Sequence, residues 1–206
     1  MSKKAIILDL DNTIYPVSAI GDKLFKSLLE LITQSGENTG SFDEIKGEIF
    51  RRPFQFIADD FAFSAKLKAD SLQLLADLTY EEPVEPFEDY KEVSKLPCKK
   101  FLVTTGFTKM QYSKIRMLGI GNDFEEIFVI DPGSSDLNKT DIFRKIMKDY
   151  NLDAEDVIVV GDDLNSEIKA GKELGIATVL YDHKAEHTEM DGQIVITNFR
   201  ELERYI

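Results

Sequence analysis

The chain has 206 residues, 43% hydrophobic and 31% charged, enough to bury the core of one domain or of a domain with a large insertion. Lys and Arg total 25 against 38 Asp and Glu, so the formal net charge is −13. So acidic a surface argues against general binding to nucleic acid or anionic membranes, although a metal and a few local cations can draw a small anionic substrate into a cleft. Cys98 is the single cysteine, which excludes an intrachain disulfide and favours location of the protein in a reducing cytoplasm. No apolar run is long enough to cross a bilayer, and the N-terminus does not resemble a signal peptide.

Residues 5–13 organise the rest of the chain. The apolar run 5–8 predicts a short buried strand, and Asp9 and Asp11 follow where that strand should end. Because Leu10 would point to the opposite side of an extended chain, the two carboxylates are expected to share one side. Two acids at the mouth of a buried strand repel each other unless a proton or a hard cation such as Mg²⁺ intervenes. An isolated Asp-x-Asp is more often a solvated turn, so the interpretation depends on the later strands.

Residues 16–84 predict helices and no convincing buried strand. Apolar residues recur at helical spacing over 20–32, and Ser41 is placed to cap the next helix. Pro83 and Pro86 mark a linker at the end of this region. The expected helices are 20–32, 42–50, an aromatic-rich segment at 54–63, and 65–78, with a loop at 35–41.

From about residue 87 onward, helices and strands alternate. Strands are expected at 101–104, 126–130, 157–160, 176–180 and 194–196, and helices at 87–96, 109–118, 140–150, 165–174 and 199–204. This alternation predicts an α/β fold, a parallel sheet with helices on both faces. The strand at 5–8 belongs to the same sheet by composition, so the helical region 16–84 is an insertion after the first strand.

Candidate binding residues follow four of these strands, at or beyond the points where the strands end. They are Asp9 and Asp11 after the first strand, Thr104, Thr105 and Gly106 after the next, Lys139 beyond the strand at 126–130, and Gly161, Asp162 and Asp163 after the strand at 157–160. Open parallel sheets bind ligands beyond the carboxyl ends of their strands. Taken singly, each has a more ordinary interpretation: Thr104 as a strand-end hydroxyl, Lys139 as a solvated lysine at a helix start, and residues 161–163 as a turn. Their joint order predicts a site for phosphate and a divalent cation.

Each of these residues has a chemical role at such a site. Asp9 can attack phosphorus and form an aspartyl phosphate. Asp11 can give a proton to the leaving oxygen and later take one from water. Thr104 and Lys139 can bind and balance the phosphoryl oxygens. The candidate Mg²⁺ ligands are Asp9, Asp11 and Asp162, and the candidate phosphate-binding residues are Thr104, Thr105, Gly106 and Lys139.

As a set, these residues resemble the haloacid dehalogenase-like (HAD) superfamily of phosphohydrolases. Residues 9–13 are similar to its first motif, Asp-x-Asp-x-Thr, Thr104 to its second and Lys139 to its third. Gly161-Asp162, with an acid five residues later, is similar to its fourth. The resemblance implies a Rossmann-like core at 1–15 and 85–206 and an inserted helical cap at 16–84, similar in position to the family's C1 cap. Because the family's dehalogenases lack the second Asp of the first motif, Asp11 favours phosphoryl transfer to water.

The chain departs from the family pattern at three positions. Thr140 stands where Pro usually follows the third-motif lysine, and Thr105 stands where Asn is typical. Glu167 stands where the last acid of the fourth motif is usually Asp. Either Glu167 or the neighbouring Asp163 is therefore the possible second acid of the metal site.

The cap is expected to select the substrate, as mobile lids do. Arg51 and Arg52 are its densest positive charge and could bind an anionic group, although a solvated helix end is the more ordinary reading. Tyr15, at the cap hinge, could contact substrate or simply pack. His183 and His187 lie four residues apart in a polar stretch at 182–192, where a surface loop is expected rather than a metal site.

The leading hypothesis is a cytoplasmic Mg²⁺-dependent phosphatase that hydrolyses a small phosphorylated metabolite, such as phosphoglycolate, a sugar phosphate or a nucleotide, through an aspartyl phosphate. A phosphotransferase or phosphomutase on the same core is one alternative. A catalytically silent member with a binding or regulatory role is another, although the intact acids, Thr104 and Lys139 argue against it.

Overall fold

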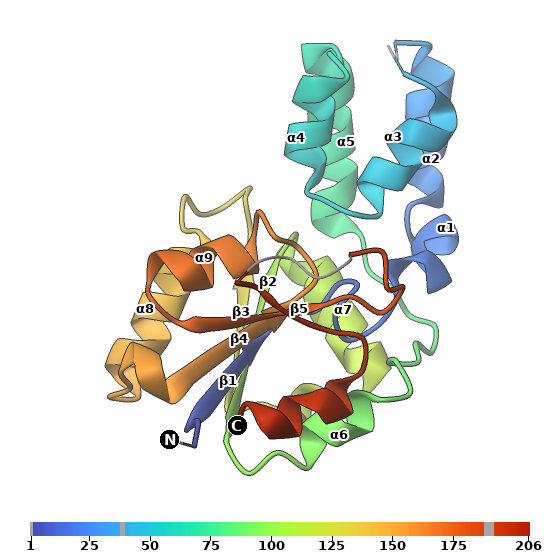
Figure 1. Ribbon diagram of the computed structural model, residues 1–206. Coiled ribbons are helices and arrows are strands. Elements are labelled where there is room, and N and C mark those ends of the chain that lie inside the picture. The colour runs from blue at the N-terminus through green and yellow to red at the C-terminus, as the bar shows by residue number, and fades with distance from the viewer. Residues whose placement is uncertain (1, 38–39, 188–191) are drawn as a thin grey trace.

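A computed structural model describes residues 2–37, 40–187 and 192–206, and Figure 1 shows a parallel sheet flanked by helices with a second group of helices at one end. The strands are β1 Ala5–Leu8, β2 Lys99–Thr105, β3 Glu126–Ile130, β4 Val157–Gly161, β5 Ala177–Tyr181 and β6 Ile194–Ile196. Their order in the sheet is β3-β2-β1-β4-β5-β6, and every neighbouring pair is parallel. The α/β prediction is confirmed.

The central strand β1 lies where the strand order reverses. Leu8 pairs with Leu102 of β2 on one side and with Val160 of β4 on the other. From β2 the chain builds outward to β3, and from β4 it builds the opposite way to β5 and β6. Crevices that bind ligands form at such switch points, beyond the carboxyl ends of the strands. The fold therefore places Asp9 and Asp11, just after β1, at that crevice.

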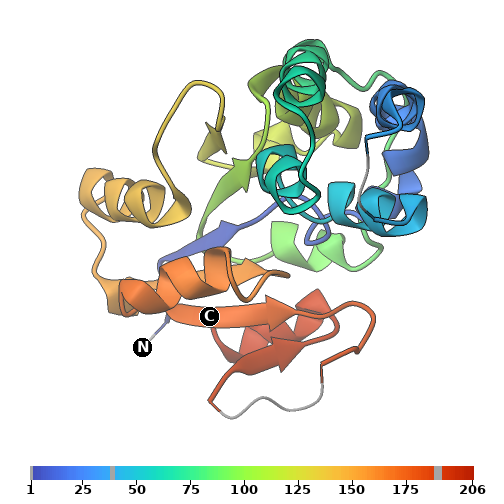
Figure 2. The same ribbon diagram turned by 90° about the horizontal axis from the view of Figure 1, so that it is seen from above.

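Helices cover both faces of the sheet (Figure 2). The helices α6 Tyr90–Ser94, α7 Thr108–Leu118 and the 3-10 helix η4 Phe199–Arg204 contribute to one buried cluster, and α8 Lys139–Asp149 and α9 Glu167–Glu173 to the other. In β1, Ile6 and Leu8 belong to the first cluster, whereas Ala5 and Ile7 belong to the second. This alternation is the two-residue period of a strand buried on both faces. Short 3-10 helices at Gly121–Asp123 (η2) and Ala154–Asp156 (η3) lead into β3 and β4.

The insertion between β1 and β2 is helical throughout its described residues. It comprises the 3-10 helix η1 Val17–Ala19 and the helices α1 Gly21–Leu24, α2 Lys26–Ser35, α3 Phe42–Ile49, α4 Phe54–Asp60 and α5 Ala65–Asp77. The single helix expected at 20–32 is divided at Phe25, whose ψ of 10° leaves the helical range. The predicted cap on α3 is confirmed, because the Ser41 side chain accepts a hydrogen bond from the Glu44 N–H at 3.2 Å.

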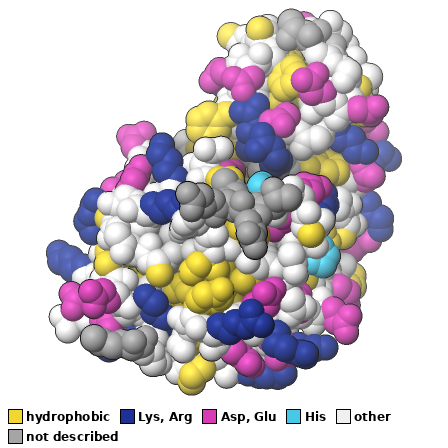
Figure 3. Space-filling model, in the orientation of Figure 1, with side chains coloured by type: hydrophobic (Ala, Val, Ile, Leu, Met, Phe, Trp, Pro, Cys, Tyr) yellow, Lys and Arg dark blue, Asp and Glu magenta, His cyan; other side chains and the backbone are white. Residues whose placement is uncertain are grey.

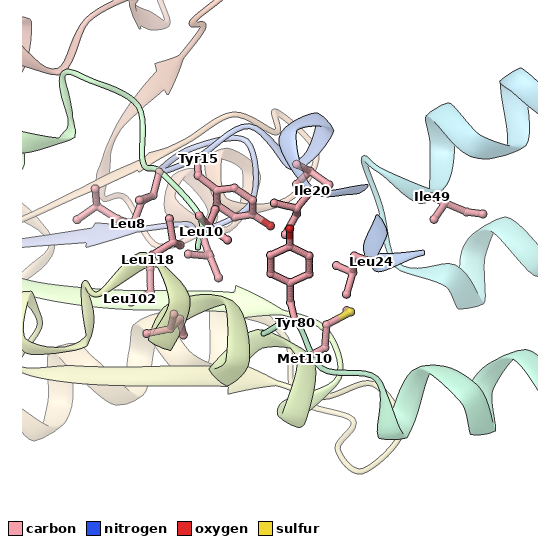
Figure 4. Packing of buried hydrophobic residues seen from close by; sticks show 14 of the residues in the cluster. Leu8, Leu10, Tyr15, Ile20, Leu24, Ile49, Tyr80, Leu102, Met110 and Leu118 are labelled. Carbon is pink, nitrogen blue, oxygen red and sulfur yellow. The ribbon is translucent and has the colours of Figure 1, made fainter. Parts of the chain in front are cut away.

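One hydrophobic cluster runs from the sheet into the inserted helices. Leu8, Leu102 and Leu118 lie at its sheet end, and Leu24 and Ile49 at its helical end (Figure 4). This shared packing fixes the base of the insertion to the end of the sheet where the strands finish. The cap boundaries, 16 and 84, stay predictions. No helix in the described ranges is both long and apolar enough to cross a membrane.

Candidate active site

The sequence-predicted residues come together at one cavity of about 810 Å³. It lies between the carboxyl ends of the strands and the inserted helices, and its wall includes Asp9, Asp11, Thr104, Thr105, Gly106, Lys139, Asp162, Asp163 and Glu167. Arg51 and Arg52 line the same cavity from the insertion. Tyr15 is fully buried and is not among the described residues that line it.

Lys139 bridges two buried carboxylates. Its Nζ donates to Asp9 Oδ1 at 2.6 Å and to Glu167 Oε2 at 2.7 Å. Burial raises the pKa of Asp9 to about 7, the Glu167 carboxylate adds to the rise, and Lys139 opposes it. Burial also disfavours the ammonium of Lys139, but the two carboxylates outweigh it and raise the pKa of Lys139. Lys139 is therefore a fixed cation beside the candidate nucleophile.

Asp162 reaches the same place from the end of β4. Its Oδ1 accepts a hydrogen bond from Thr13 Oγ1 at 3.1 Å, which joins the first strand end to the fourth motif. Burial, with the nearby Asp9 and Glu167 carboxylates, raises the pKa of Asp162 to about 8. Burial therefore disfavours full ionisation of both acids near neutral pH.

The donor set suits a hard divalent cation. In the described structure, the hydrogen bonds to Asp9 and Asp162 use Oδ1 of each and leave Oδ2 of each available. Carboxylate oxygens are the ligands that Mg²⁺ prefers, and its charge would offset the burial and the like-charge repulsion that raise both pKa values. Within the described ranges, no three His, Cys, Asp or Glu side chains gather closely enough to hold a metal alone. Backbone, water or substrate oxygens would therefore have to complete the coordination.

Asp11 is held by three side chains that the sequence analysis did not connect with it. Lys114 Nζ donates to both carboxylate oxygens, at 2.8 and 2.9 Å. Tyr15 Oη donates to Oδ1 at 2.5 Å, and Gln111 Nε2 donates to Oδ2 at 2.9 Å. Burial raises the pKa of Asp11, but Lys114 and these hydrogen bonds outweigh it, so the pKa lies below its usual value. Asp11 is therefore ionised and fixed in direction.

The spacing of residues in the sequence indicates that two of these partners, Gln111 and Lys114, are buried. Gln111, Lys114, Ile115 and Leu118 follow the spacing of the buried stripe of α7, and all four are buried. A lysine and a glutamine on an apolar stripe indicate a buried polar partner. The sequence could not reveal that this partner is Asp11, because the contact spans 103 residues.

Thr104 and its neighbours form the second strand end. Thr104 is buried, and its Oγ1 accepts a hydrogen bond from Gln111 Nε2 at 2.6 Å, so Gln111 links it to Asp11. Gly106 has a φ of 157°, in the region that favours glycine. Its N–H donates to the Ile130 carbonyl at 2.9 Å. The Thr104 hydroxyl thus lies at the cavity wall and is linked through Gln111 to Asp11.

Glu167 and Asp163 occupy different places. The Glu167 side chain is 3% exposed and also accepts the Asp163 N–H, at 2.6 Å, whereas Asp163 Oδ1 accepts the Asn165 N–H at 2.7 Å. Gly161 makes this possible, because a Cβ there would lie 2.2 Å from Glu167 Cγ. The glycine is required by the space that Glu167 fills.

The two histidines have separate partners. His183 Nδ1 lies 3.3 Å from Tyr181 Oη, and His187 Nδ1 lies 3.3 Å from Asp182 Oδ2. Neither belongs to a metal-binding group within the described ranges. Residues 188–191 of the expected surface loop lie outside the described residues.

Comparison with known proteins finds similar hydrolases. Residues 3–175 match the family model of haloacid dehalogenase-like hydrolases. The chain is 22% identical over 196 residues to a glyceraldehyde 3-phosphate phosphatase of Methanopyrus kandleri, covering 85% of this chain and 82% of the relative. A protein of the same name from Pyrococcus furiosus is 24% identical over 203 residues, covering 91% of this chain and 84% of the relative.

Solved structures show the same fold. The haloacid dehalogenase-like protein SP0104 of Streptococcus pneumoniae superposes with a TM-score of 0.73 at 16% identity, covering 99% of both chains. The putative HAD-hydrolase YfnB of Bacillus subtilis, whose structure is described as bound to magnesium, superposes with a TM-score of 0.66 at 19% identity, covering 100% of this chain and 99% of that one.

Proposed function

We propose that this chain, a phosphate-ester hydrolase that belongs to the haloacid dehalogenase-like hydrolases, is a Mg²⁺-dependent phosphatase that acts on a small metabolite through an aspartyl phosphate at Asp9. The observation that carries the proposal is the contact of Lys139 with Asp9 at the mouth of β1, beside Asp162 and Thr104. The names of the relatives make a phosphorylated triose a first candidate substrate.

Asp9 supplies the nucleophile. Its Oδ1 is held by Lys139, which leaves Oδ2 for attack or for a metal. When a carboxylate oxygen attacks phosphorus, a new P–O bond forms as the bond to the leaving oxygen breaks. Lys139 and Thr104 line the cavity with Asp9 and would bind the phosphoryl oxygens whose charge is redistributed in that step. Bound at Asp9 and Asp162, Mg²⁺ would supply a further positive charge to the phosphoryl group.

Asp11 acts as the general acid and then as the general base. It gives a proton to the leaving oxygen, then takes one from the water that attacks the phosphorus and releases phosphate. The contact with Lys114 favours the ionised form of Asp11. A bound phosphate is a like charge, which raises a carboxyl pKa and favours the protonated acid that the first step needs.

The direct test is phosphate release from p-nitrophenyl phosphate, triose phosphates, phosphoglycolate, sugar phosphates and nucleoside monophosphates, with Mg²⁺ or with EDTA. We expect turnover with Mg²⁺ and a loss of at least about a thousandfold in kcat for Asp9→Asn. Asp149→Asn, an exposed residue at the end of α8, is the matched control and should behave like the wild type. Equal activity in Asp9→Asn would refute the mechanism.

A further inference from the structure

The inserted helices present two arginines to the cavity, and carboxylates already balance both. Arg51 Nη2 lies 2.9 Å from Glu48 Oε2, and Arg52 Nε also contacts Glu48. Arg52 Nη2 lies 2.6 Å from Asp60 Oδ2. Two positive and two negative charges thus form one neutral network, which we call the arginine network.

The network stabilises the charged forms of its members. Burial raises the pKa of Glu48, but the hydrogen bonds and charges of Arg51 and Arg52 outweigh it and hold that pKa below its usual value. Burial lowers the pKa of Arg52, but Asp60 and Glu48 outweigh it and raise that pKa.

On the face drawn in Figure 3, acidic and basic side chains are interspersed over the inserted helices without a large patch of one sign.

Apart from Gln55, the rest of this wall is apolar. Ile49, Phe50, Phe54 and Phe56 line the cavity from α3, α4 and the segment between them. Phe56 is 60% exposed although it is a large hydrophobic residue. An apolar surface interacts well with a neutral group and poorly with a charged one, which would lose its hydration there.

The charge balance leaves little attraction for a second anion. Among the described residues that line the cavity, seven are acidic and five are basic. Lys114 is engaged by Asp11, and Lys139 by Asp9 and Glu167, so among the described lining residues Lys169, an exposed residue of α9, is the cation outside these pairs and the arginine network. One Mg²⁺ would offset the acidic excess, and the phosphoryl group of the substrate would then bring the remaining negative charge. A carboxylate or second phosphate on the substrate would face a wall that is apolar apart from Gln55 and a network whose arginines are already paired.

We infer that the substrate is a phosphate monoester whose remaining part is uncharged, and that the arginine network discriminates against esters with a second anionic group. The inference rests on the proposed phosphatase function and names the substrate class of the same site.

The test compares three esters that share a three-carbon chain and one phosphate. Glyceraldehyde 3-phosphate has a neutral aldehyde where 3-phosphoglycerate has a carboxylate, and glycerol 3-phosphate is a second neutral substrate. For the wild-type protein with Mg²⁺, we expect kcat/KM to be at least about tenfold higher for the two esters with an uncharged remainder than for 3-phosphoglycerate. A charge left uncompensated near a protein surface costs roughly that factor. Equal values, or a preference for 3-phosphoglycerate, would overturn the inference and leave the phosphatase function standing.

The variant Glu48→Gln tests the arginine network itself. It removes the carboxylate that pairs both arginines, so it should raise kcat/KM for 3-phosphoglycerate by up to about fivefold and leave glycerol 3-phosphate unchanged. Asp60→Asn, at a side chain 58% exposed, removes a partner of Arg52 alone. It should raise the ratio of kcat/KM for 3-phosphoglycerate to kcat/KM for glycerol 3-phosphate, but by less than Glu48→Gln. This second variant tests the network even if Glu48→Gln folds poorly.

Asp43→Asn is the matched control. It makes the same change of charge from the first turn of α3, and Asp43 is not among the described residues lining the cavity. Its substrate ratio should equal that of the wild type. A shift as large as that of Glu48→Gln would show a general charge effect and refute the assignment to the network. If the wild type cleaves none of the esters, including p-nitrophenyl phosphate, the proposed function fails and the inference fails with it.

Discussion

Lys114 holds both oxygens of the Asp11 carboxylate, although the two residues lie 103 positions apart in the chain. Lys114 is nearly fully buried, and Asp11 is its ion-pair partner. A buried lysine is costly unless its charge is matched, so the contact fixes α7 against the end of β1. It also fixes the direction of the group that is proposed to protonate the leaving oxygen.

Removing Lys114 should impair cleavage of esters with poor leaving groups. We expect kcat/KM of Lys114→Met to fall about a hundredfold for glycerol 3-phosphate, because general-acid catalysis of that size depends on a positioned Asp11. The p-nitrophenolate group leaves without a proton, so kcat/KM for p-nitrophenyl phosphate should change little. Since Lys114 lowers the pKa of Asp11, the alkaline limb of the pH profile should also move to higher pH in the variant.

Two further variants control this experiment. Lys109→Met changes an exposed lysine of the same helix and should match the wild type on both substrates. Tyr15→Phe removes one hydrogen bond to Asp11 and keeps most of the buried ring, so it should give a smaller selective loss. Equal losses on both esters would mean that Lys114 supports only the fold.

Mg²⁺ affinity should increase with pH between about 6 and 8. Asp9 and Asp162, with pKa values of about 7 and about 8, are partly protonated over this range, and a bound cation must displace those protons. Calorimetry in two buffers of different ionisation enthalpy should therefore detect proton release on Mg²⁺ binding at pH 7. Binding with no proton release at pH 7 would contradict the raised pKa values.

Without metal, the folded protein should lose stability as pH rises. The ordinary carboxyl pKa of 3.8 is raised to about 7 for Asp9 and about 8 for Asp162 in the fold, so their contribution is complete below about pH 4 and is lost as pH rises through 7 to 8. The melting temperature in EDTA should fall from pH 6 to pH 8.5, and saturating Mg²⁺ should reduce the fall. A metal-free melting temperature that increased over this range would oppose the prediction.

Glu167 should matter more than Asp163. Glu167 accepts hydrogen bonds from Lys139 and from the Asp163 backbone, so Glu167→Gln should lower Mg²⁺ affinity or kcat by roughly 10- to 100-fold. Asp163→Asn should cost less than about threefold, because its side chain caps a local turn. Titration of Mg²⁺ dependence in both variants decides between them, and a larger loss in Asp163→Asn would reverse the assignment.

Two Gly→Ala changes should have opposite effects on stability. A Cβ at Gly171 in α9 would lie 2.6 Å from Thr178 Cγ2 of β5, so Gly171→Ala should destabilise the protein by about 1–3 kcal/mol. Gly47 in α3 has nothing within 4 Å of that position, so Gly47→Ala should stabilise by about 0.5–1 kcal/mol. Urea denaturation of both variants tests the predicted packing of α9 on the sheet.

The sheet and the strand-end acids could be predicted because their signals are local. The run at 5–8 is apolar and carries β-branched residues, and the acids follow it directly in the chain. The partners of Asp11 could not be predicted in the same way, since Tyr15 and Lys114 reach it through tertiary packing. The pairing of Arg52 with Asp60 likewise depends on how α3 and α4 meet, which the residue types alone do not determine.

The most direct measurement of the central claim is mass spectrometry of Asp11→Asn protein quenched during turnover of a cleaved ester with Mg²⁺. Loss of the Asp11 base should slow attack by water, so a phosphoryl group should accumulate on the peptide that contains Asp9. That mass increase, absent from the Asp9→Asn, Asp11→Asn double variant, is the predicted result. Turnover of the ester with no phosphoryl group on Asp9, or with one on another residue, would contradict the account.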